Sequence, residues 1–299
     1  MFPGASADRE AADYVVVGAP LDVSTTFQPG ARFGPDRVRR FARTYDDYDR
    51  RTGQHLSDLA VHDHGDVRAW DDAEEYLEYL EGVLTDVRWD DAVPLLLGGE
   101  HTISLAGVRA VEPDAFVCLD AHLDLREEYD GNTLSHATVT RHALDGWESS
   151  DSQSRQTQSD GVADVAVILG ARTGSEAEWE RASESDVTVV PPEDVSDWTP
   201  DFAAAGDGDD EEQSVYLSVD IDAADPGFAP GTGTMEPFGL TPRELRNVVR
   251  AVANSCDVQG FDVVEVNDRD DGQSAAIAGK LLREFVFSHA DSTASSDGE

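Results

Sequence analysis

The sequence predicts a three-layer α/β/α fold built on a parallel sheet of about eight strands. Eight short runs of apolar and β-branched residues recur along the 299 residues, and the segments between them are long enough for crossover helices. The runs are continuously apolar rather than alternating, which is typical of strands buried on both faces of a parallel sheet. Hydrophobic residues make up 39% of the chain, so a sizeable buried core is possible.

The expected strands follow these runs in chain order. They cover residues 14–20, 59–65, 93–99, 115–122, 165–171, 187–190, 215–222 and 261–267. We expect residues 1–288 to form a single domain and residues 289–299 to be a disordered tail, because that tail is small and polar. Two further polar segments, 148–160 and 205–213, are expected to be additions on the surface.

Two of the connecting segments carry clear helix signals. Residues 71–87 have apolar side chains at helical spacing and acids in the first turn, which favours an amphipathic helix there. Residues 241–255 begin with Thr241 as N-cap and Pro242 at the first helical position. Glu244 then stands where a capping box needs it, so a helix is predicted from this point.

The charge of the chain is unusual. It has 62 acidic and 22 basic residues, a formal net charge of −40. Nucleic acid and anionic membranes are excluded as natural partners, and an acid excess this large indicates a protein adapted to a high-salt cytoplasm that screens the repulsion. No apolar run is long enough to predict a membrane span, and the two cysteines predict no disulfide framework.

Histidines and carboxylates gather where predicted strands end. These residues are His101, Asp120, His122, Asp124, Asp220, Asp222 and Glu265. Asp120, His122 and Asp124 are spaced at i, i+2 and i+4, so an extended chain points all three to one face. Groups packed so closely need a positive charge between them.

The chemistry of this set favours two metal ions. In open α/β sheets, ligands bind at the carboxyl ends of the strands, which is where these side chains are expected. Two imidazoles and four carboxylates suffice for two divalent ions that share bridging carboxylates. A donor set rich in oxygen, with some imidazole, suits Mn²⁺ better than zinc.

The motifs together resemble those of the ureohydrolases, the family of arginase, agmatinase and formimidoylglutamase. The matching stretches are "GGEHT", "DAHLD", "SVDID" and "FDVVEVN", with "PGARFGPDRVR" at 29–39 before them. The stretch "ADPGFAPGTGTMEPFGLTPRE" at 224–244 is most similar to the agmatinase branch. The resemblance spans residues 14–287. It implies an arginase-like fold, two Mn²⁺ per chain, a homo-oligomer (trimer or hexamer) and hydrolysis of a guanidino group.

The resemblance also implies roles for individual residues. His101 and Asp124 would hold one manganese, His122 and Asp222 the other, and Asp120 and Asp220 would bridge the pair. Asp124 would also carry a proton inside the site, His136 would exchange protons with solvent, and Glu265 would receive the guanidinium. Two positions depart from the common family pattern, which often has Asp where Glu100 stands and Gly where Ala137 stands.

The expected substrate is agmatine, a small cationic guanidino compound, which hydrolysis converts to putrescine and urea in polyamine biosynthesis. An acid-rich stretch, Glu127 to Asp130, could face its second cation. Formimidoylglutamase stays open as an alternative because Arg126, Arg141 and Arg172 could bind substrate carboxylates. A guanidino acid hydrolase and an inactive scaffold or regulatory protein of the same fold also stay open.

The remaining histidines are expected to have no part in the site. His55, His62, His64 and His142 are interpreted as surface or packing residues, and His289 is placed in the tail.

Overall fold

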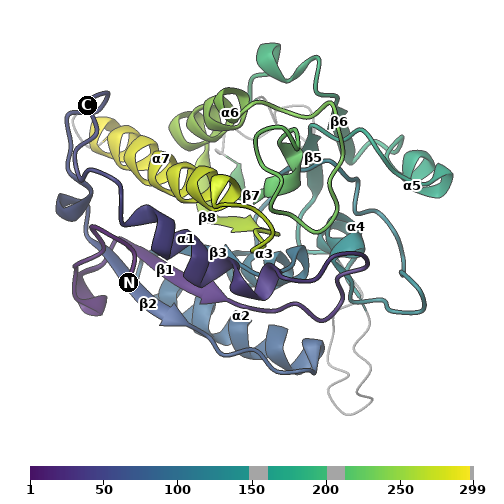
Figure 1. The fold of residues 1–299 in the computed structure, drawn as a ribbon, viewed down its shortest axis with the longest axis horizontal. Helices are drawn as coiled ribbons and strands as arrows, with labels where there is room; N and C mark the ends of the chain where they lie inside the picture. The colour runs from purple at the N-terminus through teal and green to yellow at the C-terminus, as the bar shows by residue number, and fades with distance from the viewer. Residues whose placement is uncertain (148–160, 201–212, 297–299) are drawn as a thin grey trace.

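The structure is a computed structural model that describes residues 1–147, 161–200 and 213–296. All eight predicted strands are confirmed, and they form one parallel sheet in the order β2-β1-β3-β8-β7-β4-β5-β6 (Figure 1). The strands are β1 Tyr14–Ala19, β2 Val61–Asp66, β3 Val93–Gly98, β4 Ala115–Leu119, β5 Val165–Leu169, β6 Val187–Val190, β7 Ser214–Asp220 and β8 Asp257–Val264. Most of their residues are buried, as continuous apolar runs predict for a central parallel sheet.

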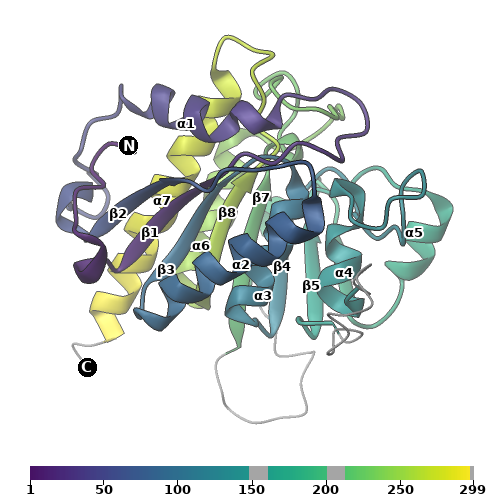
Figure 2. The ribbon, with the colours of Figure 1, turned by 90° about the horizontal axis from the view of Figure 1, so that it is seen from below.

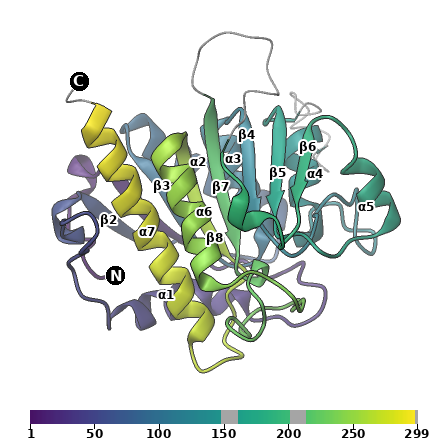
Figure 3. The same ribbon diagram turned by 90° about the horizontal axis from the view of Figure 1, so that it is seen from above.

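Helices cover both faces of the sheet. They are α1 Gly34–Ala42, α2 Ala73–Trp89, α3 Ser104–Val111, α4 Val139–Asp145, α5 Glu176–Arg181, α6 Pro242–Ser255 and α7 Gln273–Ser296. Buried residues of α1, α6 and α7 form one core with the sheet, and those of α2, α3 and α4 form another (Figures 2 and 3). Neighbouring residues Val15 and Val16 of β1 belong to different cores, as the period of two in a strand requires. The predicted three-layer architecture is confirmed.

Both predicted helices are present and begin as their caps indicate. The side chain of Asp72 accepts a hydrogen bond from the Glu75 amide at the start of α2. At the start of α6, Thr241 and Glu244 form the predicted capping box, with Pro242 in the first turn. Caps of this kind satisfy amide groups that have no partner within the helix, so the sequence determines where each helix starts.

The chain near the C-terminus differs from the prediction. Helix α7 continues to Ser296, so most of the expected tail 289–299 is helical. The reason is packing, because His289 follows Phe285 by one helical turn and stacks on it with ring centroids 5.4 Å apart. Its Nδ1 atom also lies 2.9 Å from the Tyr14 hydroxyl, which ties the helix to β1.

Two other expectations concern segments that the structure covers little or not at all. Residues 148–160 lie outside the described residues, as does 205–212 of the predicted acidic loop. Among the described residues, no helix is both long enough and apolar enough to cross a membrane.

The order of the strands determines where a site can form. Strand β3 is followed in the chain by β4, yet β8 and β7 lie between them in the sheet. The connections therefore change direction at the centre of the sheet, and in open α/β sheets such a switch point opens a crevice at the carboxyl ends of the strands. The carboxyl ends of these four central strands carry the predicted site residues.

Candidate functional site

The structure brings the predicted residues of the four central strands together. His101 opens the 3₁₀ turn after β3, and the turn that follows β4 carries Asp120, His122 and Asp124. Asp220 is the last residue of β7, Asp222 follows it in a 3₁₀ turn, and Glu265 comes directly after β8. Residues up to 164 positions apart in the chain thereby meet at one edge, since His101 and Glu265 are hydrogen-bonded.

His101 faces three carboxylates with the same ring nitrogen. Its Nδ1 atom lies 2.9 Å from Asp124 Oδ2, 3.1 Å from Asp120 Oδ2 and 3.7 Å from Asp220 Oδ2. It is fully buried, yet none of these contacts has the geometry of a hydrogen bond. A buried polar atom without a partner is rare in proteins, and this one is surrounded by oxygen atoms that suit a cation.

His122 forms a second, adjoining group. Its Nδ1 atom lies 3.1 Å from Asp222 Oδ2 and 3.4 Å from Asp120 Oδ1. Asp120 thus presents one oxygen to each histidine. Among the described residues, two clusters have donor atoms close enough to hold a metal ion, His101 with Cys118 and Asp120, and Asp120 with His122 and Asp222, and Asp120 is the member that they share. This is the arrangement that a carboxylate bridging two ions requires.

The carboxylates of the site destabilise one another when charged. Burial, and then the charges of Asp222, Asp120 and Glu265, hold the pKa of Asp220 well above its usual range. Burial and the charge of Asp120 raise the pKa of Asp124 to about 6. Burial also opposes ionisation of Asp120, but its contacts with the two histidines outweigh burial and lower its pKa. Divalent cations would relieve this repulsion, so the donor set fits a pair of metal ions.

The far side of His101 contains residues that the sequence analysis did not identify. Its Nε2 atom lies 3.1 Å from Ser218 Oγ, which donates a hydrogen bond of 2.6 Å to Asp262. The hydroxyl of Tyr216 donates to the other oxygen of Asp262 at 2.8 Å. Cys118 is packed beside the same ring, with its Sγ atom 3.7 Å from Nε2. Such a chain of partners fixes the orientation of an imidazole and leaves its opposite nitrogen free to bind a cation.

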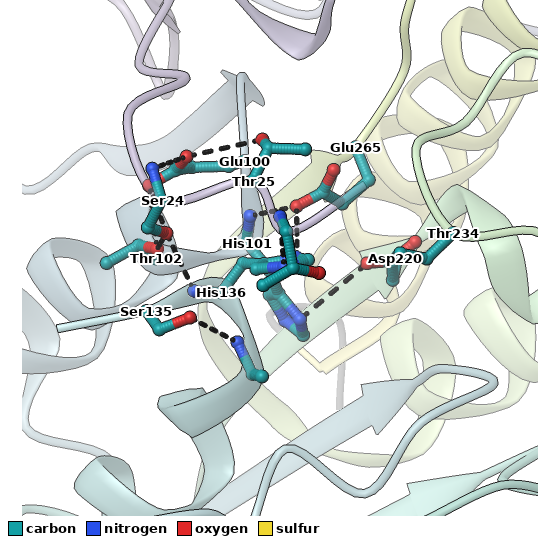
Figure 4. A network of polar contacts seen from close by, with 12 residues as sticks. Ser24, Thr25, Glu100, His101, Thr102, Ser135, His136, Asp220, Thr234 and Glu265 are labelled. Atoms are coloured by element: carbon teal, nitrogen blue, oxygen red, sulfur yellow. Dashed lines mark hydrogen bonds and ion pairs between the residues drawn. The ribbon is translucent and has the colours of Figure 1, made fainter. Parts of the chain in front are cut away.

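Glu265 is held in an unusual conformation beside the cluster. Its φ of 61° lies in the left-handed region, as does the φ of 51° at Asp124. Its Oε1 atom accepts a hydrogen bond of 2.8 Å from the His101 amide. The other oxygen, Oε2, is buried and has no hydrogen-bond partner (Figure 4). An ideal Cβ placed on Gly233 would lie 3.8 Å from this oxygen, so glycine leaves the space beside it open.

His136 lies next to Glu265, the other residue to which the resemblance gave a part in the site without metal binding. Its Nδ1 atom is 3.3 Å from Glu265 Oε1. Burial lowers the pKa of His136, but the carboxylate of Glu265, with the charges of Asp124 and Glu100, outweighs burial and raises the pKa to about 9. The ring is thereby coupled to the carboxylate that faces the site (Figure 4).

A pocket of about 300 Å³ opens onto this cluster. Its lining includes Asp220, Asp124, His122, His136 and Thr234 from the site, together with Arg126, Tyr129, Glu178 and the turn at 173–175 before α5. Glu178 is 4% exposed, and its Oε2 atom lies 3.1 Å from Arg126. The sequence analysis missed Glu178, whose visible signal was the capping box that it forms with Ser175.

The acid-rich stretch 127–130 contributes differently from the expectation. Of residues 127–130, Tyr129 is the one that lines the pocket. The Arg126 guanidinium lies over its ring, 5.2 Å from the ring centroid. Glu127 instead points to solvent and pairs with Arg141 at 3.3 Å. A tyrosine and an arginine therefore form this side of the pocket, while Glu127, Glu128 and Asp130 are exposed.

The other histidines are outside the cluster. His142 is buried in α4, with both ring nitrogens facing backbone oxygens of Gly146 and Thr133. His62 contacts the carbonyl of Ala7, and His55 lies 3.4 Å from Asp47 near the surface. These contacts agree with packing and surface roles.

The fold and the site define a class: a parallel α/β protein whose central strand ends carry carboxylates and imidazoles around a pocket. A glutamate beside the cluster has one oxygen free for a cationic group. The chain belongs to the Arginase family, whose profile matches residues 12–288. It is an Arginase-family ureohydrolase, a class of enzymes that hydrolyse guanidino compounds.

Individual relatives match over nearly the whole chain. An agmatinase of Halalkalibacterium halodurans is 32% identical, over 96% of this chain and 96% of that protein. The N(1)-aminopropylagmatine ureohydrolase of Thermococcus kodakarensis is 32% identical, over 92% of this chain and 90% of that protein. Among solved structures, agmatine ureohydrolase of Thermoplasma volcanium is similar with a TM-score of 0.84 and 30% identity, over 98% of this chain and 95% of that chain.

Proposed function

We propose that this enzyme hydrolyses agmatine to putrescine and urea, with two Mn²⁺ ions per chain. The observation that carries the choice of substrate is Glu178, a buried carboxylate that lines the pocket beyond the metal cluster. Agmatine carries a guanidinium and an amine, so it needs two anionic partners. Glu265 supplies one, and Glu178 supplies the other on the side of the pocket formed by α5 and the turn before it.

The geometry also argues against a substrate carboxylate. Arg172 donates to six backbone carbonyls, including those of Asp222 and Glu236, so its guanidinium is fully used within the fold. Arg141 is paired with Asp145 at 2.5 Å and with Glu127. Arg126 is paired with Glu178. Arg172 and Arg141 therefore offer no free guanidinium to formimidoylglutamate, and Arg126, which lines the pocket, would do so only if its ion pair with Glu178 opened.

The six donor residues would hold the ions in the way that the resemblance implies. His101 and Asp124 would hold one, His122 and Asp222 the other, and Asp120 and Asp220 would bridge them. When bound, such a pair of ions supplies Lewis acidity and lowers the pKa of water so that hydroxide forms near neutral pH. The contact between His101 Nε2 and Ser218, whose hydroxyl donates to Asp262, would keep His101 oriented for this task.

The other polar groups would position the substrate and move protons. Glu265 Oε2 would accept hydrogen bonds from the guanidinium and fix its plane, because Oε1 is already used by the His101 amide. Asp124 and His136 both line the pocket. Asp124 would deliver a proton to the departing amine, and His136 would exchange protons with solvent.

A substrate panel tests the proposal. Urea and formamide release would be measured with Mn²⁺ in molar KCl on agmatine, N1-aminopropylagmatine, 4-guanidinobutyrate, arginine and formimidoylglutamate. We expect kcat/KM for agmatine to exceed that for arginine and formimidoylglutamate at least about tenfold, or about 1.4 kcal/mol of transition-state discrimination. Preference for formimidoylglutamate or guanidinobutyrate would contradict the assignment. Elemental analysis that found no bound metal after loading would favour an inactive scaffold.

The large negative charge of the chain supports the proposal that the protein works at high salt concentration. An excess of 62 acids over 22 bases favours folding in the cytoplasm of a cell with high internal salt. The proposal includes this location. It also includes a single catalytic domain over residues 1–288, and assembly of the chain into a trimer or hexamer. Light scattering of the Mn²⁺-loaded protein in molar KCl would measure the oligomer.

A further inference from the structure

His136 is held by a second element opposite Glu265. The loop between β1 and α1 passes over the pocket, and Thr26 reaches the His136 ring from there. The Thr26 amide donates a hydrogen bond of 3.2 Å to His136 Nε2. The hydroxyl of the same residue lies 3.0 Å from that nitrogen. Thr26, which is exposed, therefore presents two groups to His136 Nε2. Its amide can only donate a hydrogen bond, whereas its hydroxyl can donate or accept one.

These contacts determine where the proton of the neutral ring sits. A backbone amide can only donate, so Nε2 must offer its lone pair. The hydrogen of the neutral ring is then on Nδ1, which faces Glu265 Oε1 at 3.3 Å. When the ring takes a second proton at Nε2, that N–H needs an acceptor, and the Thr26 hydroxyl oxygen is the acceptor within reach.

The segment that carries Thr26 is firmly anchored. Ser24 Oγ accepts a hydrogen bond of 2.9 Å from the His136 amide and donates one of 2.8 Å to Glu100 Oε1 (Figure 4). The Ser24 amide donates to the other oxygen of Glu100 at 2.8 Å. Thr102 also donates to Glu100, which is fully buried. Glu100 thus joins the loop to the end of β3. These hydrogen bonds fix the position of the loop relative to His136.

We propose that Thr26 is a positioning residue for proton exchange at His136. Its amide selects the neutral tautomer with hydrogen on Nδ1, and its hydroxyl accepts the N–H of the protonated ring and links Nε2 to solvent. This role rests on the proposed function of His136 as the group that exchanges protons. The charges of three carboxylates also raise the pKa of the ring. Glu265 follows β8, Asp124 lies in the turn after β4, and Glu100 lies just after the end of β3.

The hydroxyl makes a specific difference that can be measured. Thr26→Val keeps the shape and the amide but removes the hydroxyl, so the protonated ring loses its acceptor at Nε2, whereas the neutral ring keeps the amide as a donor to that atom. The pKa of His136 should therefore fall, by about one unit for a hydrogen bond to a charged group. Thr26→Ser keeps the hydroxyl and should restore the original pKa.

Carbethoxylation by diethyl pyrocarbonate tests this without turnover. The reagent attacks unprotonated imidazole, so mass spectrometry of the peptide with His136 at several pH values gives its pKa in the Mn²⁺-loaded protein. We expect the midpoint to fall in Thr26→Val, to stay at the wild-type value in Thr26→Ser, and to stay there in Thr25→Val. Thr25 is the neighbouring control, because its hydroxyl donates to Asp22 at 2.7 Å and, at the longer distance of 3.5 Å, to Glu100, but not to His136.

The pH profile of urea release adds a second readout. In Thr26→Val the alkaline limb of kcat should move to lower pH by the same amount, with KM for agmatine unchanged, whereas a general loosening of the loop would change both. Equal labelling midpoints in wild type and Thr26→Val, or failure of Thr26→Ser to restore the midpoint, would overturn the role of Thr26. A wild-type protein that released no urea while the midpoints shifted as expected would overturn the proposed function and leave the role of Thr26 intact.

Discussion

Replacing Glu178 with glutamine should separate recognition of the second cation from the chemistry. Glu178 Oε2 accepts hydrogen bonds from the Ser175 amide at 2.8 Å and from its hydroxyl at 2.7 Å. Glutamine can also complete a capping box, so α5 should remain folded in Glu178→Gln. Arg126 would lose its partner, but its side chain is 35% exposed and can be hydrated. The change therefore removes one negative charge and little else.

The size of the effect follows from the charges. Two unit charges about 4 Å apart interact with about 4 kcal/mol at the effective dielectric of a protein surface. An incoming amine must displace Arg126, which now lies 3.1 Å from Glu178, so part of this energy is lost. We therefore expect the substitution to lower kcat/KM for agmatine about 10- to 100-fold, equivalent to about 1.4–2.8 kcal/mol.

A comparison of two substrates makes the test specific. Butylguanidine has the guanidinium of agmatine and no amine, so its kcat/KM should change less than about threefold in Glu178→Gln. Glu127→Gln is the matched control, since Glu127 is 82% exposed at its side chain and outside the pocket lining. Equal losses for agmatine and butylguanidine in Glu178→Gln would refute the reasoning, as would an agmatine loss of similar size in the control.

Three further outcomes are expected. Asp120→Asn should reduce both metal ions together, because Asp120 belongs to both donor clusters; elemental analysis that found one ion fully retained would contradict a bridge. Gly233→Ala should raise KM for agmatine at least about tenfold with metal content unchanged, because its Cβ would lie 3.1 Å from the Gln28 carbonyl and narrow the space beside Glu265; an unchanged KM would count against that position for the guanidinium. The thermal midpoint should rise from low to molar KCl, because the Debye length falls from about 30 Å at 0.01 M to about 3 Å at 1 M; equal midpoints would argue against adaptation to salt.

The clustering of the carboxylates and histidines proposed to hold the ions was predictable from sequence because its signal is local. The spacing of two predicts an extended chain with Asp120, His122 and Asp124 on one side. In the structure β4 ends at Leu119, Asp124 is left-handed and Asp222 lies in a 3₁₀ turn, so turns directly after the strands bring these side chains together. The sheet then brings the residues of different strands together, because parallel strands have all their carboxyl ends at one edge. Neither the spacing nor the edge depends on details of side-chain packing.

The partners of these residues could not be found in the same way. Glu178 looks like an ordinary capping residue in sequence, and only the fold brings it to the pocket beside Arg126. Arg172 looked available for a substrate, yet backbone carbonyls of the 222–224 turn and of 236–237 use its guanidinium. Thr26 reaches His136 across 110 positions of chain. Each of these contacts is set by loops, whose paths depend on tertiary packing more than on local pattern.

This difference suggests a division of tasks within the molecule. The metal donors and Glu265 stand at the ends of adjacent central strands, where hydrogen bonds such as that from the Glu265 amide to the Gly99 carbonyl, 2.8 Å, restrain the backbone. The left-handed conformations of Asp124 and Glu265 are costly, and a rigid sheet edge can hold them there. The groups proposed to choose among substrates lie instead at the start of α5, with the turn before it, and on the loop after β4. Loops can change without disturbing a sheet, and the relatives of this chain include proteins named for agmatine and for N(1)-aminopropylagmatine. On the proposed function, the charge balance of Arg126 and Glu178 would thus be the physical basis for choosing between such substrates in this chain, while the chemistry would depend on the strand ends.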